Sequence, residues 1–298
     1  MLNVIKSKNI CFAVSIIIIL AGIVFYFVNG GFNLDIDFTG GTTITIDMEG
    51  KDYNTDDIYD LTKSTLGFSA SNVQSSADGS IIISISTPKE INDDAALSTD
   101  DRVKLFNAIK DKYGLTSDSP INQDSIDATV GKELRKSAVL SCIVALILML
   151  VYISIRFELW SGVAAVLSLA HNVLVLMSIY SIFHLNINTT FIAAILTIVG
   201  YSINDTIVTF DRIREITRKV KKTPFTDIVN KGVNETVIRS INTSITTLLT
   251  IVILYFVGVA SIKEFALPII IGIVVGTYSS IFIASPIWSL FRREKKTA

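Results

Sequence analysis

Six long runs of apolar residues recur along the chain, each about as long as a segment that crosses a bilayer. They cover approximately residues 10–28, 137–155, 161–183, 189–210, 240–260 and 265–290. A helix needs about 20 mainly apolar residues to span the hydrocarbon core. The first run follows Lys6 and Lys8 and is longer than the apolar part of a typical signal peptide, so we interpret it as an uncleaved membrane helix. The pattern therefore predicts an α-helical polytopic membrane protein with six transmembrane helices.

The polar segment between the first two runs, residues 30–133, has a different pattern. Ile81, Ile83 and Ile85 alternate with other residues as in a half-buried strand, and Ser98 has the chemistry of a helix N-cap. The pattern predicts strands at 42–48, 70–76, 80–87 and 121–129, helices at 55–66 and 98–113, and a turn at Asp78-Gly79. This order predicts an inserted α+β ferredoxin-like unit, in which two helices cover one face of a four-stranded antiparallel sheet.

The chain then divides into three parts. Residues 1–29 contain the first membrane helix, residues 30–133 form the α+β unit, and residues 134–298 contain the other five membrane helices.

Charges are distributed unevenly along these parts. Of the 298 residues 50% are hydrophobic and 18% are charged, and a net charge of −1 gives no sign of nucleic-acid binding. Residues 30–130 contain 18 Asp and Glu against 7 Lys and Arg. Basic residues instead gather in the loop 211–239 and at the C-terminal end: Arg212, Arg214, Arg218, Lys219, Lys221, Lys222, Lys231, Arg239, Arg292, Arg293, Lys295 and Lys296.

This asymmetry predicts the orientation of the chain. Because cytoplasmic loops are enriched in Lys and Arg, we expect both termini and the loop 211–239 in the cytoplasm and the acidic unit outside. One feature does not fit this orientation, because three basic residues lie at the outer end of the second span: Lys132, Arg135 and Lys136.

The loop also carries an amphipathic pattern. Thr223-Pro224 has the chemistry of a helix start, since Pro is favoured at the first helical position. Apolar residues follow at mostly helical spacing, namely Phe225, Ile228, Val229, Val233 and Val237. We therefore predict a short helix that lies along the inner membrane surface and leads into the fifth span.

An acidic residue, Asp205, interrupts the fourth apolar run. A charged side chain near the bilayer centre costs at least about 2.5–3.5 kcal/mol and normally serves a function. Polar residues share its helix face or lie beside it: Ser202, Asn204, Thr209 and Arg212. This polar stripe predicts a titrating or ion-coupled carboxylate. The alternatives are a hydrated acid near a helix end, or an acid that pairs with Arg212 or Arg239 to fix packing.

Arg239 is the natural partner of this acid. It enters the fifth run from the cytoplasm, while Asp205 lies shortly before the fourth run ends there, so antiparallel neighbours would place them at similar depth. Arginine stays protonated, so it can hold a carboxylate ionised and release it when the helices separate. Asn242 and several hydroxyl residues after it continue a polar face on the fifth span, which is equally typical of hydrogen bonds between helices.

Other polar groups give weaker signals. His171 and Asn172 lie in the middle of the third span, where the histidine either relays protons or donates to a backbone carbonyl. The sequence DIDFTGG, residues 35–41, is not a phosphate loop, because no Gly-Lys-Ser/Thr follows and no helix is expected to begin there. We expect Gly40 and Gly41 to permit a tight backbone path. With two histidines and no Cys-x-x-Cys pair, the sequence predicts no metal site, no cofactor and no enzyme chemistry.

Four short motifs together resemble one family of membrane proteins. They are DFTGG (Asp37, Phe38, Thr39, Gly40 and Gly41), VGKEL at 130–134, LAHNV at 169–173 and VGYSINDTIVTFDRIRE at 199–215. In this order they resemble the SecF subunits of the bacterial SecD/SecF family, which belongs to the resistance-nodulation-division superfamily, over nearly the whole chain. Two positions depart from the family's pattern, because Asn172 stands where the family often has Asp, and Asp35 where it often has Gly.

The resemblance implies a role in protein export. It implies that the protein works with SecD and the SecYEG channel, and uses the proton motive force to draw exported, unfolded polypeptides across the bacterial cytoplasmic membrane. It also implies that Asp205 and Arg239 take part in proton conduction. Three alternatives stay open: a small-molecule or lipid exporter subunit of the same superfamily, a non-conducting scaffold, and Na⁺ in place of H⁺.

Overall fold

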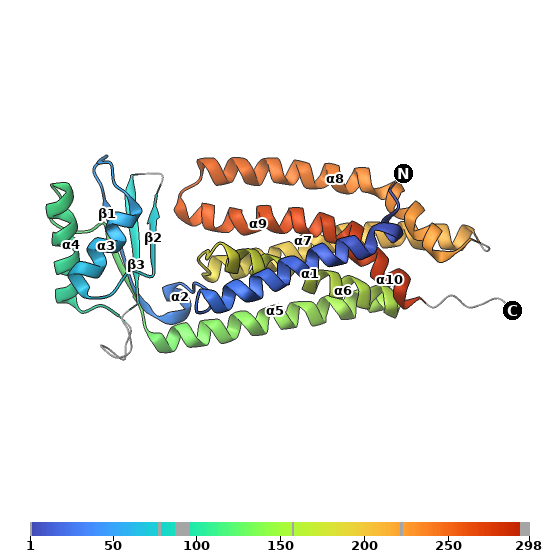
Figure 1. Ribbon diagram of the computed structural model, residues 1–298, viewed down its shortest axis with the longest axis horizontal. Coiled ribbons are helices and arrows are strands. Elements are labelled where there is room, and N and C mark those ends of the chain that lie inside the picture. The colour runs from blue at the N-terminus through green and yellow to red at the C-terminus, as the bar shows by residue number, and fades with distance from the viewer. Residues whose placement is uncertain (1, 77–78, 87–95, 157, 221–222, 293–298) are drawn as a thin grey trace.

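The prediction of six spans is confirmed by the computed structural model, which describes residues 2–76, 79–86, 96–156, 158–220 and 223–292. The spans within these residues are α1 (Val4–Val28), α5 (Ala128–Arg156), α6 (Leu159–Ile182), α7 (Thr189–Lys219), α8 (Phe225–Val257), and a sixth made of α9 (Ala260–Ser279), the π-helical turn η1 (Ser280–Ala284) and α10 (Ser285–Phe291). The helices run lengthwise beside one another, and the start of α1 and the end of α10 lie at the end away from the sheet (Figure 1).

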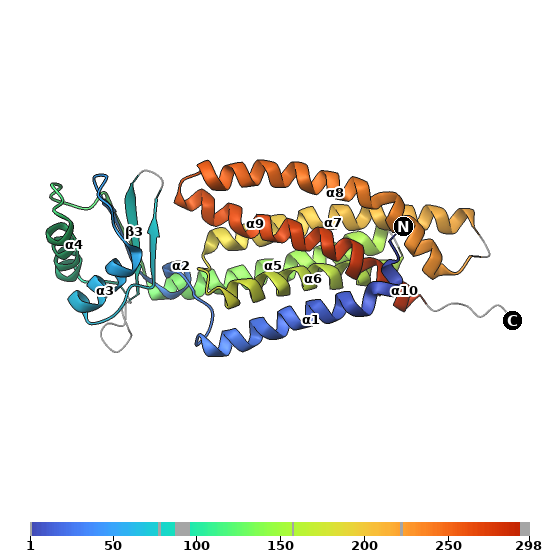
Figure 2. The same cartoon turned by 45° about the horizontal axis from the view of Figure 1, so that its top comes forward.

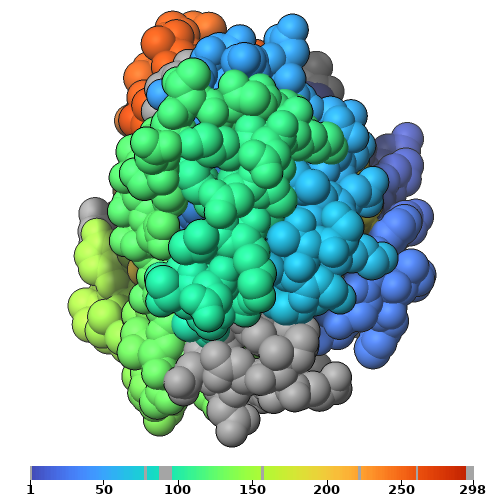
Figure 3. All heavy atoms as spheres, turned by 90° about the vertical axis from the view of Figure 1, so that its left-hand side faces the viewer, coloured from blue at the N-terminus to red at the C-terminus, as the bar shows by residue number. Residues whose placement is uncertain are grey.

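The α+β unit has the predicted ferredoxin-like fold. Its elements are β1 (Gly41–Asp47), α3 (Thr55–Leu66), β2 (Asn72–Ser75), β3 (Ser80–Ile85), α4 (Thr99–Tyr113) and β4 (Asn122–Ile126). The strands form one antiparallel sheet in the order β2-β3-β1-β4. Helices α3 and α4 cover the face away from the bundle (Figure 2), and the unit caps most of the bundle when viewed end-on (Figure 3).

Local capping explains why the two helices of this unit begin and end where the sequence predicts. The side chain of Asn54 accepts a hydrogen bond from the backbone of the first turn of α3, and Gly67 ends the helix in a left-handed conformation. Ser98 caps α4 by accepting from the backbone nitrogen of Asp101 at 3.2 Å, and Gly114 ends it in the same way as Gly67. Because these capping residues lie next to the helices in the sequence, the sequence alone predicts where α3 and α4 begin and end.

Boundaries that depend on tertiary packing differ from the prediction. Helix α5 begins at Ala128, so the last residues of the predicted strand 121–129 are helical and residue 133 lies inside a helix. Helix α7 continues to Lys219, beyond the predicted end at 210. Asp78 of the predicted turn and Thr87 of the predicted strand lie outside the described residues.

The prediction of a short surface helix before the fifth span is wrong. Helix α8 is a single helix from Phe225 onward, and its first apolar residues are buried against protein. The ring of Phe225 lies 5.4 Å from that of Trp288 on α10, and Trp288 lies 4.7 Å from Phe210 on α7. The amphipathic pattern therefore reflects packing between helices rather than contact with lipid.

A short helix, α2 (Ile36–Thr39), begins in the segment where none is predicted. Asp35 is its N-cap, with Oδ1 accepting from the backbone nitrogen of Ile36 at 2.7 Å. The expected tight path at the two glycines is confirmed. Gly40 and Gly41 have φ of +79° and +151°, and a Cβ on Gly41 would lie 2.4 Å from the carbonyl oxygen of Ile85.

Candidate functional site

Asp205 lies on the buried face of α7, with 7% of its surface exposed. Its carboxylate faces the side chains of Ser240 and Thr243 on α8, and the positive charge of Arg239 acts on it from the same helix. Within the described part of the chain no ion pair joins Asp205 to Arg239, whose side chain is exposed. The structure thus brings the two residues near one another without direct contact.

Next to Asp205, hydrogen-bonding side chains connect three helices through the bundle core. Asn172 Nδ2 on α6 donates to Ser202 Oγ on α7 at 2.7 Å. Thr206 Oγ1 and Ser280 Oγ lie 2.9 Å apart, and both hydroxyls also approach the Ser202 carbonyl oxygen, at 3.3 Å and 3.4 Å. All four side chains are buried. The network crosses the π-helical turn η1, a kind of irregularity that is frequent at functional sites.

His171 lies at the edge of this network. Its Nδ1 is 3.4 Å from Oδ1 of Asn172, and its ring centroid is 6.4 Å from that of Tyr278. Its buried Nε2 has no hydrogen-bond partner among the residues that the structure describes. The proposed relay role for His171 therefore has no continuous path on the Nε2 side in this conformation.

The other predicted polar residues divide into two groups. Thr209 is buried on the same face as Asp205 and shares a 3.3 Å hydrogen bond with Thr236 of α8. Asn204 and Asn242 are exposed and lie outside the network. Successive residues on an α-helix are rotated by about 100°, so a residue next to Asp205 in sequence faces a different direction.

Arg212 forms the centre of a charged cluster where α7 and α8 cross. Its Nε donates to Glu235 at 2.5 Å, its Nη1 pairs with Glu215, and Lys219 also pairs with Glu215 at 2.6 Å. Arg212 is thereby committed to these acids rather than to Asp205.

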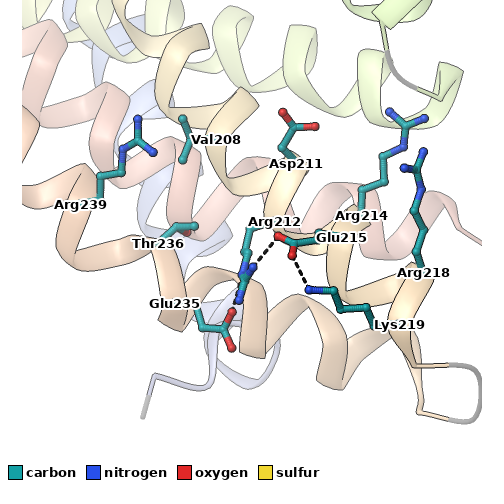
Figure 4. Close-up of a pocket in the computed structure, with 10 residues that line it drawn as sticks. All are labelled: Val208, Asp211, Arg212, Arg214, Glu215, Arg218, Lys219, Glu235, Thr236 and Arg239. Carbon is teal, nitrogen blue, oxygen red and sulfur yellow. Dashed lines mark hydrogen bonds and ion pairs between the residues drawn. The ribbon is translucent and has the colours of Figure 1, made fainter.

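The cluster borders an open groove of about 740 Å³ between α7 and α8, which we call the α7–α8 groove. It is lined by Val208, Asp211, Arg212, Arg214, Glu215, Arg218, Lys219, Glu235, Thr236 and Arg239 (Figure 4). Val208, Thr236 and Arg239 form its inner end, about one helical turn from Asp205 along α7. The groove thus brings the surface at this end of the bundle close to the buried carboxylate.

Sequence reasoning missed the hydroxyl groups of the sixth span, and Ser168 on α6, which form further hydrogen bonds in the bundle core. Ser279 and Ser168 share a 2.6 Å hydrogen bond, as do Thr277 and Ser244, in addition to the contacts of Ser280. A signal was present, because residues 277–280 read TYSS within the last apolar run. Four consecutive polar residues inside a span indicate contact with protein rather than lipid.

A second polar cluster joins the α+β unit to the outer end of the bundle. Glu264 on α9 accepts hydrogen bonds from Gln74 of β2 and from Asn188, the N-cap of α7. Asp35 Oδ2 accepts from Asn186 at 2.8 Å, and burial raises the pKa of Asp35 above its ordinary value. A cavity of about 540 Å³ lies at this junction, lined by residues from both parts.

The DFTGG motif belongs to the same junction. Asp37 Oδ2 accepts hydrogen bonds from the backbone nitrogen of Thr189, at 2.9 Å, and from its hydroxyl, at 2.6 Å. Phe38 is buried, and Thr39 closes the turn by donating from Oγ1 to the Asp35 carbonyl oxygen. The motif therefore anchors the start of α7 to the link that follows α1.

Residues 107–294 match the family described as "Protein export membrane protein SecD/SecF, C-terminal". The chain belongs to the SecD/SecF family. The SecF protein translocase subunit of Sebaldella termitidis is 38% identical over 299 residues, which cover 99% of this chain and 93% of that protein. The SecDF subunit of Bacillus subtilis is 38% identical over 295 residues, 98% of this chain but 38% of that longer protein.

A solved structure agrees with these matches. The crystal structure of SecDF from Thermus thermophilus superposes with a TM-score of 0.81 at 33% sequence identity, and the match covers 96% of this chain and 38% of that chain. The chain thus has the SecD/SecF fold, with six candidate membrane spans and one α+β unit among its described residues.

Proposed function

We propose that the protein is a SecF-type accessory subunit of the Sec translocase that uses the proton motive force, together with SecD, to promote protein export. Membership of the SecD/SecF family supports the role in export. Relatives named SecDF, in which one chain matches ours over 38% of its length, support a SecD-type partner. The SecYEG channel and unfolded exported polypeptides are the further partners in this proposal.

The observation that carries the proton-coupling part is the surroundings of Asp205. A carboxylate with 7% exposure sits between hydroxyl groups, near Arg239 but without an ion pair. A neutral, protonated Asp205 fits this hydroxyl environment, whereas an ionised one favours closer approach of the arginine. Proton binding and release would therefore change the distance between α7 and α8.

The energy that a proton gains by crossing the membrane is large enough to drive such a movement of α7 against α8. One elementary charge that crosses a potential of 100 mV yields about 2.3 kcal/mol, comparable with the 1–3 kcal/mol or so of typical allosteric coupling. Helix α9, which packs against both α7 and α8, carries Glu264 at the junction with the α+β unit. Movement of α7 against α8 at Asp205 would therefore reach the α+β unit through α9.

In the proposed orientation the α+β unit lies outside the cytoplasmic membrane, and both termini and the α7–α8 groove face the cytoplasm. The positive-inside tendency supports it, because five Arg and Lys line the groove at this end. In a variant without Cys11 and Cys142, a single cysteine introduced at Lys231 should react with an impermeant thiol reagent only in inside-out vesicles.

The central experiment measures proton flux in vesicles that contain this chain with its SecD partner. Asp205→Asn should abolish flux and the stimulation of export while the complex still assembles. Asp227→Asn is the matched control, because it makes the same change at an exposed position on α8. Stimulation of export in sodium-free buffer separates H⁺ from Na⁺ coupling, since only Na⁺ coupling would lose the stimulation there.

Other results would favour the alternatives. If flux and export survive Asp205→Asn with normal assembly, the proton-coupling proposal fails and a scaffold role remains. If the complex moves small amphiphilic molecules rather than stimulating export, a small-molecule exporter is the better description.

A further inference from the structure

We propose that the end of α5 next to the α+β unit binds the phosphate of an anionic phospholipid headgroup from the leaflet on that side. Three exposed basic residues, Lys132, Arg135 and Lys136, carry the site, and we call them the α5 basic face. Their side chains leave the helix within an arc of about 100°, because they are three and four residues apart. They are also the basic residues that do not fit the positive-inside tendency, and an anionic headgroup would compensate their charge.

The depth of the α5 basic face matches the headgroup layer of a bilayer. The apolar run of α5 begins at residue 137, and the basic face occupies residues 132–136 just before it. At about 1.5 Å per residue, this segment rises by about 7.5 Å along the helix axis. The headgroup layer on each side of the hydrocarbon core is about 5–7.5 Å thick, so the three cationic groups lie level with lipid phosphates.

The cationic groups of this face are free to meet a ligand. None of the three forms an ion pair within the ranges of the chain that the structure describes. Asp127 lies near enough to Lys132 to feel its charge, without forming an ion pair with it. Lys132 lies between Arg135 and Lys136 around the helix axis, so these long side chains can converge on one phosphate and donate charge-assisted hydrogen bonds to it. Glu133 is exposed at the flank of the face, about 100° from Lys132.

The protein covers a different side of α5. A Cβ at Gly131 would lie 3.0 Å from the carbonyl carbon of Phe38 in α2, and Ala138 is buried in the core of the bundle. These two positions lie about 100° and 120° from Lys132 around the helix, on the side opposite to Lys136. Lys132 and Lys136 therefore point away from the contact with α2, toward the surrounding membrane.

Apolar residues on the same side of α5 distinguish a lipid from a soluble anion. Val139, Ile143 and Ile147 continue the line of Lys132 and Lys136 along the helix, at steps of three or four residues. Their exposed fractions are 57%, 49% and 54%. An acyl chain would lie along this stripe in the hydrocarbon core while its headgroup meets the basic groups. A free phosphate or a soluble acidic polypeptide would use the basic groups but gain nothing from the stripe.

The test uses the full chain in a neutral detergent and measures the first retained lipid by native mass spectrometry. Phosphatidylglycerol and phosphatidylcholine are offered in equal amounts, and wild type should retain the former preferentially. The double variant Arg135→Gln/Lys136→Gln should lower this preference roughly 25-fold, since each basic residue near an anionic surface contributes roughly fivefold. The matched control, Lys63→Gln/Lys104→Gln, removes two exposed charges from α3 and α4, which cover the face away from the bundle, and should leave the preference unchanged.

Three results would overturn the proposal. They are equal retention of the two lipids by wild type, an equal loss in the control variant, and displacement of the lipid by glycerol phosphate or polyglutamate at equal concentration, which would indicate a site for soluble anions. If the double variant fails to fold, Lys136→Gln alone, at an exposed position, should still lower the preference about fivefold. Because the assay needs neither SecD nor a proton gradient, its outcome is independent of the proton-coupling proposal.

Discussion

Gly22 permits the close approach of α1 to α6, and its replacement by alanine gives a test of the packing of the bundle. A Cβ at Gly22 would lie 2.3 Å from the Cβ and 2.5 Å from the Cα of Ser178. Carbon atoms at rest lie about 3.5–4.0 Å apart, so the two helices must separate by roughly an ångström. The obstacle includes backbone, which a rotamer change cannot move aside.

The expected loss of stability in Gly22→Ala has two sources, the overlap with Ser178 and a weakened hydrogen bond. Overpacking of a well-packed interface costs typically about 1–3 kcal/mol. Separation of the helices also weakens the 2.9 Å hydrogen bond from Ser181 Oγ to the Gly22 carbonyl oxygen, which contributes about 0.5–1.5 kcal/mol. We therefore expect Gly22→Ala to lower the free energy of unfolding by roughly 2–4 kcal/mol.

The assay is unfolding of the full chain in one detergent, with Gly200→Ala as the matched control. Gly200 lies on α7, and a Cβ added there would meet no atom of the described residues within 4 Å, so alanine should be neutral or slightly stabilising. Equal stability of Gly22→Ala and wild type would refute the argument from close approach. An equal loss in both variants would show that helical glycine itself, rather than the α1–α6 contact, matters.

Three further predictions concern the α+β unit and its junction. Glu264→Ala leaves the side-chain amides of Gln74 and Asn188 without their acceptor, which costs about 1–3 kcal/mol for the buried Asn188 and less for the half-buried Gln74. Hydrogen exchange should become faster in β2 and at the start of α7, and unchanged exchange there would contradict the contact. Burial raises the pKa of Asp35, so the folded state keeps a proton that the unfolded chain releases, and stability should fall as pH rises from the ordinary aspartate value through the raised one. Asp35→Asn should lose this dependence in pH-resolved unfolding, and persistence of the slope would assign it to another group. Ser98→Ala removes the N-cap of α4 and should destabilise the unit by about 0.5–2 kcal/mol, while Ser64→Ala, an exposed serine within α3, should have a smaller effect in the same measurement.

The features predictable from sequence are those that local chemistry determines. Helix α3 runs from Thr55 to Leu66 as predicted, because Asn54 and Gly67 terminate it by their own side-chain and backbone preferences. Apolar length alone located the six spans. The prediction for the start of α8 is wrong because the sequence pattern of an amphipathic helix is the same whether its apolar face lies against lipid or against the Trp288 ring.

The part of the candidate site that lies on one helix was predictable from the sequence, because it depends only on local spacing. Asp205 stands out as an acid in an apolar run, and helical spacing correctly placed Ser202 and Thr209 on its buried face. Spacing along one helix does not reveal the serines that the sixth span contributes, since that depends on how η1 packs against α7. Arg212 was assigned to the acid's face, but its geometry favours the closer Glu215 and Glu235.

The π-helical turn η1 sets the rotational phase of everything that follows it. A turn with one extra residue sets the later side chains back by about 100° relative to an uninterrupted α-helix. In this phase Trp288 contacts the rings of Phe210 and Phe225, and Ser280 in the same turn donates from Oγ to the Ser202 carbonyl oxygen at 3.4 Å. If this one turn returned to α-helical geometry, α10 would rotate about its axis and Trp288 would lose its contacts with the two phenylalanine rings. A change in η1, which packs against α7 near Asp205, would therefore be transmitted to the end of the last span.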